Sequence, residues 1–471
     1  MYSALQPGRA VPDADGVGGA AYLCRMSEQQ EISQLVTAVF RAWREAGINC
    51  LVLRNYESLP HFSTNDIDVL VDPRQSRQAE RVLLEAASKS GFRLHNRVEF
   101  ATLALFLSSR QSNAQAHFDL FTALKWRGFE FVACEGFLQR KVGRDLFFIP
   151  HPADETATKL LASFIYTGKV KDNYKSSIVT GLQAERAAIR DLLTLTYGSA
   201  HAKFLVEAGA QARWADLEAA TGALRQALIL RQLGRRPWRT IKALLIDARR
   251  LARRFLQPPG VTVVLCGADG SGKSTAARAV IEGLRVTFSA QKVRQFHWKL
   301  PMFSTRRLAA RSPTTDPHGQ PARNAAVSLC YFGFHWLEFF LGSHLRLRPI
   351  TVRGELVLID RFYYDFFVDQ RRYRLRLPQA LVRLGLFFLK KPDMVVLLDA
   401  PAEVLQKRKQ EVPLAETERQ RAAYLALVRS LRNGRVVDAT QPHEKVGADI
   451  SRAILDFMAE RTRRRWGLSN P

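Results

Sequence analysis

A strand that runs through a glycine-rich turn into a helix constrains this chain more than any other feature. Residues 261–275 read VTVVLCGADGSGKST, an apolar and β-branched run followed by glycines, lysine and serine at the spacing of a phosphate-binding loop. Glycine permits positive φ and close backbone approach, so the N–H groups of such a turn can point at phosphate oxygens. The residues expected at a nucleoside triphosphate are Gly267, Gly270, Gly272, Lys273, Ser274 and Thr275.

The chemistry of this loop assigns a role to two of its side chains. Lys273 is expected to reach the β- and γ-phosphates, and the hydroxyl of Ser274 is expected to bind Mg²⁺. The following segment, Ala276–Leu284, is predicted to be a helix whose N-terminal dipole faces the phosphates.

Three further apolar strands are predicted, and each of them ends in aspartate: Leu356–Asp360, Met394–Asp399 and Arg435–Asp438. Long helical patterns separate them, which is typical of an α/β fold with a parallel sheet wrapped by helices. Parallel sheets place their chemistry at the carboxyl edge of the strands. Asp360 is therefore a candidate Mg²⁺ ligand, and Arg361 beside it can clamp a phosphoryl group.

With GADGSGKST, this aspartate–arginine pair resembles the nucleoside-monophosphate kinases, above all the thymidylate kinases, over about residues 257–460. The resemblance implies ATP and Mg²⁺ as cofactors. It also implies that Asp269 contacts a sugar hydroxyl of the acceptor, that Asp360–Arg361–Phe362 faces the acceptor phosphate, and that Pro392, Asp393 and Asp399 match a PDxxxxLD strand. It further assigns Arg408 and Lys409 to a lid helix, and Asp438 and Ala439 to the loop beside the adenine ring.

The acceptor pocket departs from that family. A REPGG-type segment is replaced by VRQFHWKLPMF (Val293–Phe303), and the helix that would supply a base-binding arginine, Cys330–Ser343, contains none. The chain is more similar to divergent thymidylate-kinase-like proteins encoded with bacterial exopolysaccharide and lipopolysaccharide genes. The shared segments are His297–Trp298, Asp316–His318, and a DxxxDxxRYR stretch with Asp365, Asp369, Arg372, Tyr373 and Arg374.

The N-terminal half carries a second group of acids. Asp66 and Asp68 lie two apart in an apolar strand, so their side chains share one face, and Asp119 lies in another predicted strand. Three converging carboxylates can hold two Mg²⁺ ions for nucleotidyl transfer. The pattern resembles nucleotidyltransferases, except that Arg54–Asn55 stands where a small glycine turn is expected. Active transfer, a binding or regulatory duty, and an unrelated αβ domain all remain open.

The chain of 471 residues is long enough for about three domains. The expected organisation is disorder over 1–27, an α+β nucleotidyltransferase-like domain over 28–150, a helical extension over 151–232, a basic linker helix over 233–256 and the kinase-like domain over 257–471. Met26 opens a better helical sequence and is an alternative start. Five cysteines without metal spacing fit a reducing cytoplasm, and no signal-peptide pattern is present.

A net charge of +26 calls for an acidic partner or surface. Between Arg231 and Arg254, nine basic residues accompany one acid, Asp247, and apolar residues recur at helical spacing from Trp238 to Phe255. Such a helix either docks on an anionic membrane or packs its apolar side on a neighbouring domain. Nucleic acid is disfavoured because no recognition motif accompanies the charge. The apolar run Val327–Leu341 is expected to be a core helix under the acceptor pocket.

These features favour a cytoplasmic kinase dependent on ATP and Mg²⁺, peripheral at the inner membrane if the basic helix docks there. Its catalytic candidates are Lys273, Asp360, Arg361, Arg408 and Asp269, and its metal candidates are Ser274 and Asp360, with Asp66, Asp68 and Asp119 in the N-terminal half. The expected acceptor is a small molecule or glycolipid in surface polysaccharide synthesis, and a homodimer is allowed. The alternatives are a thymidylate or other nucleoside-monophosphate kinase, and a nucleotide-gated membrane scaffold.

Overall fold

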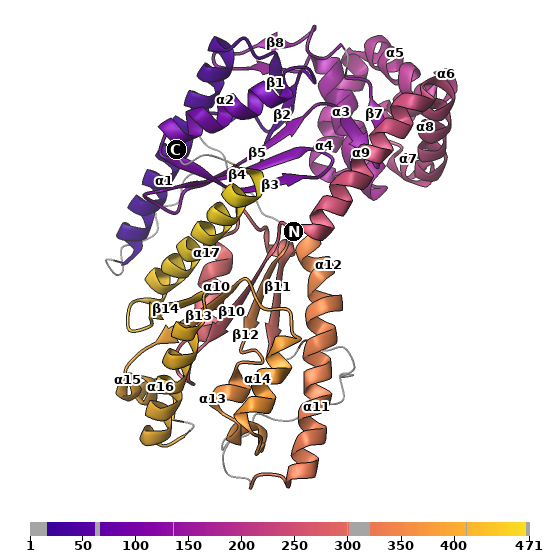
Figure 1. Ribbon diagram of the computed structural model, residues 1–471. Coiled ribbons are helices and arrows are strands. Elements are labelled where there is room, and N and C mark those ends of the chain that lie inside the picture. The colour runs from indigo at the N-terminus through magenta and orange to yellow at the C-terminus, as the bar shows by residue number, and fades with distance from the viewer. Residues whose placement is uncertain are drawn as a thin grey trace.

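The computed structural model describes residues 17–61, 66–134, 136–298, 300, 321–410 and 412–467. Two α/β sheets lie end to end, and a group of helices flanks the N-terminal one (Figure 1). The predicted α/β class is confirmed, with a mixed sheet in the N-terminal half and an all-parallel sheet in the C-terminal half. The boundaries proposed at 150, 232 and 257 stay predictions.

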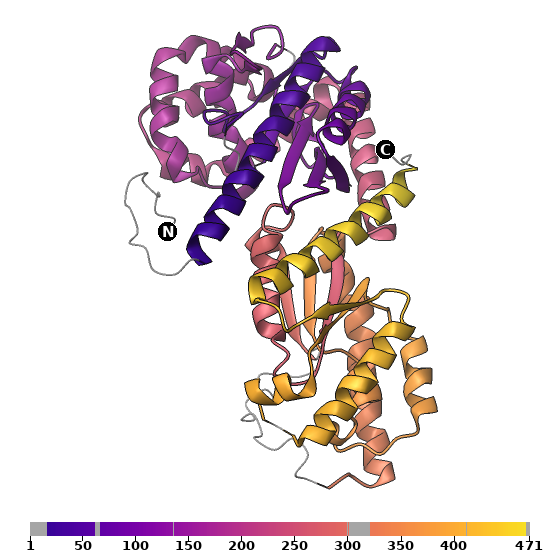
Figure 2. The same cartoon turned by 90° about the vertical axis from the view of Figure 1, so that its left-hand side faces the viewer.

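The N-terminal sheet has five strands in the order β1-β2-β5-β4-β3. Its strands are β1 (Cys50–Val52), β2 (Ile67–Val71), β3 (Phe92–Glu99), β4 (Leu103–Ser109) and β5 (Gln115–Phe121). Only β2 and β5 pair in parallel, with Asp68 beside Asp119 in register. Helices α1 (Val17–Glu45) and α2 (Ser76–Lys89) pack on it, joined by the Trp43 indole, which donates to the carbonyl of Ala79 at 2.9 Å (Figure 2).

Helix α1 begins inside the segment that was expected to be disordered. Residues 1–16 lie outside the described part of the chain, whereas residues 17–27 are helical. How far the predicted disorder extends stays a prediction. Ala20, Ala21 and Leu23 favour helix strongly enough to continue it through Gly18 and Gly19.

A helical group follows two short hairpins, β6 (Leu124–Trp126) with β7 (Phe129–Val132) and β8 (Val142–Gly143) with β9 (Phe148–Ile149). It comprises α3 (Pro152–Thr167), α4 (Asp172–Ala184), α5 (Arg186–Tyr197), α6 (Ser199–Ala210), α7 (Trp214–Ala219) and α8 (Thr221–Arg235). Their apolar faces share one core with Phe129 and Phe131 of β7. The basic helix α9 (Pro237–Leu256) starts four residues later than expected, because proline favours the first turn of a new helix.

The C-terminal sheet has the order β11-β12-β10-β13-β14, with all strands parallel. Its strands are β10 (Val261–Cys266), β11 (Val293–His297), β12 (Leu356–Asp360), β13 (Met394–Asp399) and β14 (Gly434–Asp438). One face packs on α10 (Lys273–Gly283), α15 (Ala402–Arg408) and α17 (His443–Trp466). The other packs on α11 (Ala325–Leu341), α12 (Leu347–Val352), α13 (Asp365–Val368), α14 (Gln379–Phe387) and α16 (Leu414–Ser430).

The two halves meet where α17 lies along β3, the edge strand of the N-terminal sheet. A bulge in β3 falls at His95. The hydroxyl of Thr462 donates to the His95 carbonyl at 2.9 Å, and the His95 ring lies 2.8 Å from the Thr287 hydroxyl. Gln115 donates to the carbonyl of Gly283 at 2.7 Å. This contact is polar and buried, so it fixes the orientation of the two sheets.

Helix α11 is a core helix on one side only. Phe332, His335 and Phe339 are buried, whereas Phe334 and Leu337 are exposed, which corrects the expectation that the whole run is core. The helical run continues through a π-turn to Val352. Among the described residues, Ala325–Val352 is the one helix whose length and apolar composition would allow it to cross a membrane.

Candidate functional site

The glycine-rich turn between β10 and α10 has the geometry that the sequence predicts. Gly267, Gly270 and Gly272 all have positive φ. A Cβ on Gly270 would lie 2.7 Å from the carbonyl oxygen of Leu405, so a larger residue would push α15 away from the loop. The turn therefore needs glycine both for its conformation and for the close approach of α15.

Lys273 is buried inside this loop. Its Nζ donates to the carbonyls of Gly267 and Ala268 at 3.0 and 3.1 Å. Burial, with the nearby Arg361 guanidinium, lowers the pKa of Lys273 to about 8. A phosphate anion beside the ammonium would favour the charged form of Lys273 and would offset the cost of burying that charge.

Asp360 is the strand-end acid that remains available for a metal. It ends β12 beside Leu265 of β10, and its Oδ1 is buried with no hydrogen-bond partner among the described residues. It lines a cavity of about 520 Å³ together with Lys273 and the exposed Ser274. A carboxylate oxygen and a hydroxyl facing one space fit Mg²⁺, which prefers oxygen ligands.

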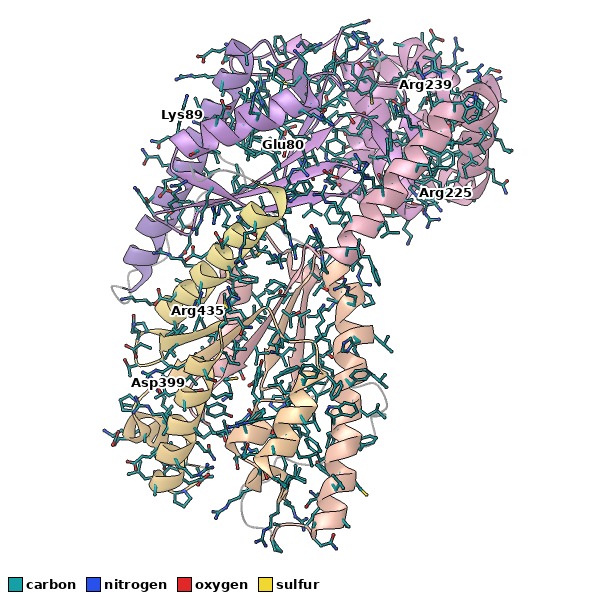
Figure 3. All side chains as sticks on the ribbon, in the orientation of Figure 1. Glu80, Lys89, Arg225, Arg239, Asp399 and Arg435 are labelled. Atoms are coloured by element: carbon teal, nitrogen blue, oxygen red, sulfur yellow. The ribbon has the colours of Figure 1, made fainter. Side chains whose placement is uncertain are left out.

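The other two strand-end acids of this sheet are engaged by the protein. Asp399, labelled in Figure 3, accepts two hydrogen bonds from Arg421 of α16, at 2.7 and 2.9 Å. Asp438 accepts from the backbone and hydroxyl of Thr440 at 2.9 and 2.6 Å. Neither lines the cavity, so the expected adenine contact of Asp438 stays a prediction.

Asp269 is held by two arginines at the cavity. Arg361 donates to its Oδ1, and Arg372 donates to its Oδ2 at 2.8 Å. The backbone of Arg361 has a positive φ of 66°, which is uncommon for residues other than glycine and is often found at functional positions. The predicted acceptor residues Asp269 and Arg361 are thus brought together, and Arg372 joins them.

Behind this arginine lies a buried carboxylate that holds it in place. Asp365 is fully buried and accepts from Arg361 at 3.0 Å, from the Tyr373 hydroxyl at 3.0 Å and from the Tyr424 hydroxyl at 2.8 Å. Asp365 and Tyr373 were expected from the family resemblance, whereas Tyr424 was not predicted from the sequence. Nothing in the spacing of α16 distinguishes that tyrosine from an ordinary core aromatic.

The lid candidates Arg408 and Lys409 lie at the C-terminal end of α15. Arg408 at the end of α15 donates to the carbonyl of Ala439 at 2.9 Å, which joins the lid helix to the loop after β14. Arg408 and Lys409 both line the cavity. Their positions suit closure over a phosphoryl group, and Ala439 is buried beside them.

The acceptor side of the cavity is aromatic. Trp298 stacks on Tyr373 with ring centroids 4.6 Å apart, and both line the cavity together with His297. The Trp298 ring also contacts His335, whose Nδ1 lies 3.1 Å from Glu338 in the buried side of α11. The expected Asp316–His318 contribution lies outside the described residues.

The three acids of the N-terminal half lie close together: Asp68 is beside Asp119 in register, and Asp66 lies near Asp119. Asp68, only 2% exposed, is bound through Oδ2 by Arg54. Burial raises the pKa of Asp68, although Arg54 opposes this shift. Asp68 thus already has a counter-ion in the protein, and the metal role expected for these acids stays a prediction.

A histidine lies among these acids. The candidate ligand atoms of Asp66, His117 and Asp119 all lie within 4.8 Å of one another. His117 Nδ1 is 2.7 Å from Asp66, and Nε2 is 3.6 Å from Asp119. Burial lowers the pKa of His117, but the two carboxylates outweigh that effect and raise the pKa to about 9. A metal would have to displace the imidazole proton, so His117 itself supplies the cation that the acids need.

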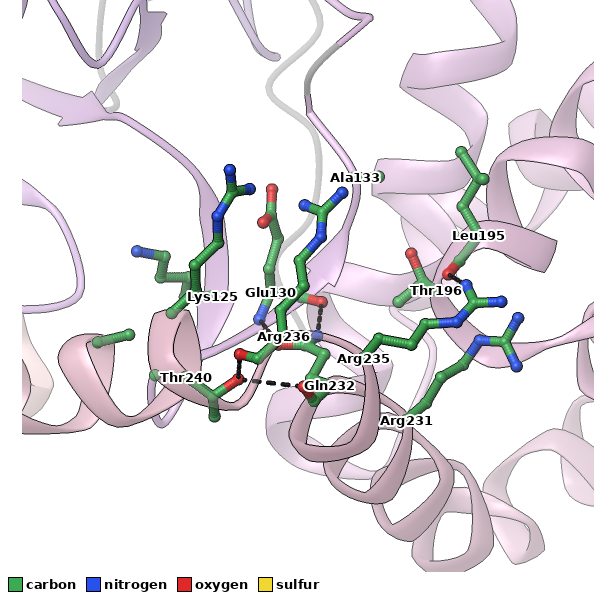
Figure 4. Close-up of a pocket in the computed structure, with 13 residues that line it drawn as sticks. Lys125, Glu130, Ala133, Leu195, Thr196, Arg231, Gln232, Arg235, Arg236 and Thr240 are labelled. Atoms are coloured by element: carbon green, nitrogen blue, oxygen red, sulfur yellow. Dashed lines mark hydrogen bonds between the residues drawn. The ribbon is translucent and has the colours of Figure 1, made fainter.

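A second cavity, of about 340 Å³, is lined by arginines of α8 and α9 (Figure 4). Arg231 and Arg235 donate to the carbonyls of Thr194 and Leu195, both at 3.3 Å. These carbonyls belong to the last turn of α5, whose C-terminal dipole favours cations. The arginines therefore cap a helix, and the cavity lies away from the chemistry of the glycine-rich loop.

Several known proteins that this chain resembles are thymidylate kinases. The chain is 30% identical to a thymidylate kinase of Chromohalobacter salexigens over 221 residues, which cover 98% of that protein and 43% of this chain. It is 25% identical to a thymidylate kinase of Xanthomonas campestris pv. campestris, over 88% of that protein and 44% of this chain. It is 26% identical to one of Xanthomonas euvesicatoria pv. vesicatoria, with the same coverage. No family model matches the chain.

Proposed function

This chain belongs to the thymidylate kinase family, and we propose that its C-terminal half is an ATP- and Mg²⁺-dependent kinase whose acceptor is not dTMP. One observation carries the proposal: Lys273, Ser274 and Asp360, whose Oδ1 has no hydrogen-bond partner among the described residues, line a single cavity together with the arginine-bound Asp269. The family relation supports phosphoryl transfer, and the side chains of the acceptor wall favour another substrate.

Bound ATP and Mg²⁺ would supply the transferable phosphoryl group and most of the charge neutralisation. The side chains of this protein would position the reacting groups. Lys273 would exchange the carbonyls of Gly267 and Ala268 for phosphate oxygens, and Ser274 and Asp360 would hold the metal directly or through water. Arg408 and Lys409 would close over the transferring group.

On the acceptor side, Asp269 would accept a hydrogen bond from a hydroxyl of the substrate while Arg361 and Arg372 hold its carboxylate in place. Asp365 acts on Arg361 and is a positioning residue. Together these groups suit an acceptor that carries both a hydroxyl and an anionic group.

A sugar or glycolipid acceptor in surface polysaccharide synthesis fits the wall of this cavity. The stacked Trp298 and Tyr373 offer an aromatic face, and residues 330–343, which lie in α11 and the start of the π-turn after it, contain no arginine to read a base. The runner-up remains a thymidylate or other nucleoside-monophosphate kinase, which the names of the relatives favour. A nucleotide-gated scaffold is the non-enzyme alternative.

For the N-terminal half we propose a nucleotidyltransferase-like domain with a binding or regulatory duty. Support comes from the parallel β2–β5 pair with its facing acids. Arg54 and His117 neutralise these acids internally, which argues against nucleotidyl transfer.

The acceptor is tested by ATP turnover against a panel of sugars, sugar phosphates, glycolipids and nucleotides, with Lys273→Ala as the background enzyme. We expect turnover with a sugar-containing acceptor and an efficiency on dTMP below about 10⁴ M⁻¹s⁻¹, a value typical of a working enzyme. Efficient phosphorylation of dTMP would restore the runner-up. ATP binding without stimulation by any acceptor would favour the scaffold.

A further inference from the structure

The basic helix α9 presents its apolar side to solvent. The exposed apolar residues include Trp238, which is 81% exposed, and Leu245, which is 66% exposed. With the exposed Ala248, they recur at three- and four-residue spacing and form a stripe: Trp238, Ile241, Leu245, Ala248, Leu251 and Phe255. Of the twenty residues of α9, only Thr240 is buried. The expectation that this apolar side packs on a neighbouring domain is wrong.

The polar side of the helix faces the protein instead. Asp247 accepts from Arg250 at 3.2 Å, and its Oδ2 would lie 3.4 Å from a Cβ on Gly128 of the β6–β7 hairpin. The Arg253 guanidinium lies 3.6 Å from the centre of the Trp466 ring of α17. Arg254 lies 4.8 Å from the centre of the Phe100 ring. These contacts fix the rotation of α9 about its axis, so the outward direction of the stripe is built into the fold.

Two basic residues border the stripe on its solvent side. Lys242 and Arg249 are exposed, and helical spacing places them next to Leu245. An exposed apolar stripe beside lysine and arginine is the pattern of a helix that lies in the interface of an anionic bilayer. A second copy of the chain is a poor occupant, because two chains of net charge +26 would bring these cations against each other.

We propose that α9 docks this protein on an anionic membrane surface, with the stripe inserted and Lys242 and Arg249 at the lipid phosphates. The helix spans about 30 Å at 1.5 Å per residue, which is long enough for a firm interfacial anchor. Helix α9 contacts α12, and α9, α12 and α11 follow one another from top to bottom along one side of the molecule in Figure 1. Phe334 and Leu337 of α11 and Leu345 of the π-turn are also exposed.

The proposal concerns location and does not depend on the reaction, so its failure and the failure of the proposed kinase function are separable. A membrane-bound enzyme would meet a lipid-linked acceptor in two dimensions. An enzyme with a soluble acceptor would keep the same docking helix without that advantage.

Sedimentation of the full chain with vesicles tests the proposal. Vesicles of phosphatidylglycerol and phosphatidylcholine should bind the protein. Vesicles of phosphatidylcholine alone should bind it with an affinity at least about tenfold lower. Binding should also fall steeply as salt rises, because the charge contribution is screened. The Trp238→Ser/Leu245→Ser variant and the Lys242→Glu/Arg249→Glu variant should each lose about tenfold or more in affinity.

The matched control is Leu195→Ser, which removes a leucine of similar exposure from α5. It should bind vesicles like the wild type. All variants should keep the wild-type circular dichroism spectrum and ATP turnover, because the changed side chains project into solvent.

Vesicle binding that is unchanged in both double variants would overturn the proposal. Light scattering that shows a dimer, converted to a monomer by Trp238→Ser/Leu245→Ser while vesicle binding is absent, would assign the stripe to a second copy instead and would also overturn it.

Discussion

Asp360 and Asp68 make an instructive pair. Each lies where two parallel strands run side by side, Asp360 next to Leu265 and Asp68 next to Asp119. Asp68 is almost fully buried and bound by Arg54, whereas Asp360 lines a cavity beside the lysine of the glycine-rich loop. A carboxylate that a protein cation already neutralises has little negative charge left to attract a metal ion. The position of the neighbouring cation, more than the acid itself, decides which of the two sites can do chemistry.

The largest effect should come from the lysine of the glycine-rich loop. Lys273→Ala should lower ATP turnover on the order of 10²–10³-fold, because a preorganised charge that faces the phosphates is lost. Steady-state turnover measures it, and Lys445→Ala, at an exposed position of α17, is the control. If a folded Lys273→Ala protein had normal turnover, the C-terminal cavity would not be the site of ATP turnover, and the proposed difference between the two sites would be wrong.

A carboxamide at each aspartate sharpens the comparison directly. Asp360→Asn should reduce turnover about 10²-fold and raise the Mg²⁺ concentration needed for half-maximal rate, since a ligand charge disappears. Asp68→Asn should leave both quantities at the wild-type value. Titration of Mg²⁺ for the two variants gives the answer, and equal effects would mean that the N-terminal acids take part in the kinase reaction.

Removing the internal counter-ion should affect stability in the N-terminal half. Arg54→Met should lower the free energy of unfolding by about 2 kcal/mol, because the buried Asp68 loses a charged hydrogen bond. Asp68→Asn in the same chain should recover most of the loss. Urea unfolding followed by circular dichroism compares the two. If Arg54→Met were neutral, the ion pair would not be what silences this site.

The smallest effect concerns pH at the contact between the halves. Burial, with the charges of Arg93 and His117, lowers the pKa of His95 to about 3, so the folded protein keeps this ring neutral. Unfolded chains bind the proton below about pH 6.5, and stability is therefore lost as pH falls from there towards 3.

At pH 5.5 the loss should be about 1.4 kcal/mol relative to pH 7.5 or above. Urea midpoints of the wild type and His95→Gln at both pH values measure it. The glutamine variant should show a pH dependence smaller by that amount. Identical pH dependence in the two proteins would show that the His95 ring is not the group responsible.

Much of the C-terminal site could be predicted because its signals are local. The glycine spacing before Lys273 and the ends of β12 and β13 were predicted at the observed residues. Contacts between distant segments could not be predicted in the same way. The Tyr424 hydroxyl on Asp365 and the Arg372 guanidinium on Asp269 depend on how α16 and residues 371–373 fold back over the sheet.

Two misses have different physical origins. His117 could have been found, because it precedes Asp119 by two residues and so shares its face of β5. The orientation of α9 could not, because an amphipathic pattern shows that a helix has two faces and not which of them meets the protein. Trp466 and Phe100, which hold the arginines of α9, come from opposite ends of the chain.

The cover that α17 gives to β3 has a consequence for how this chain can be divided. An uncovered edge strand offers unpaired backbone groups to any other strand, and natural proteins shield such edges against aggregation. Here the shield for the N-terminal sheet is the last described helix of the C-terminal half, held by Thr462 at the bulge of His95. The N-terminal half made alone would expose that edge and should self-associate, so the C-terminal half acts as the solubility partner of the N-terminal half.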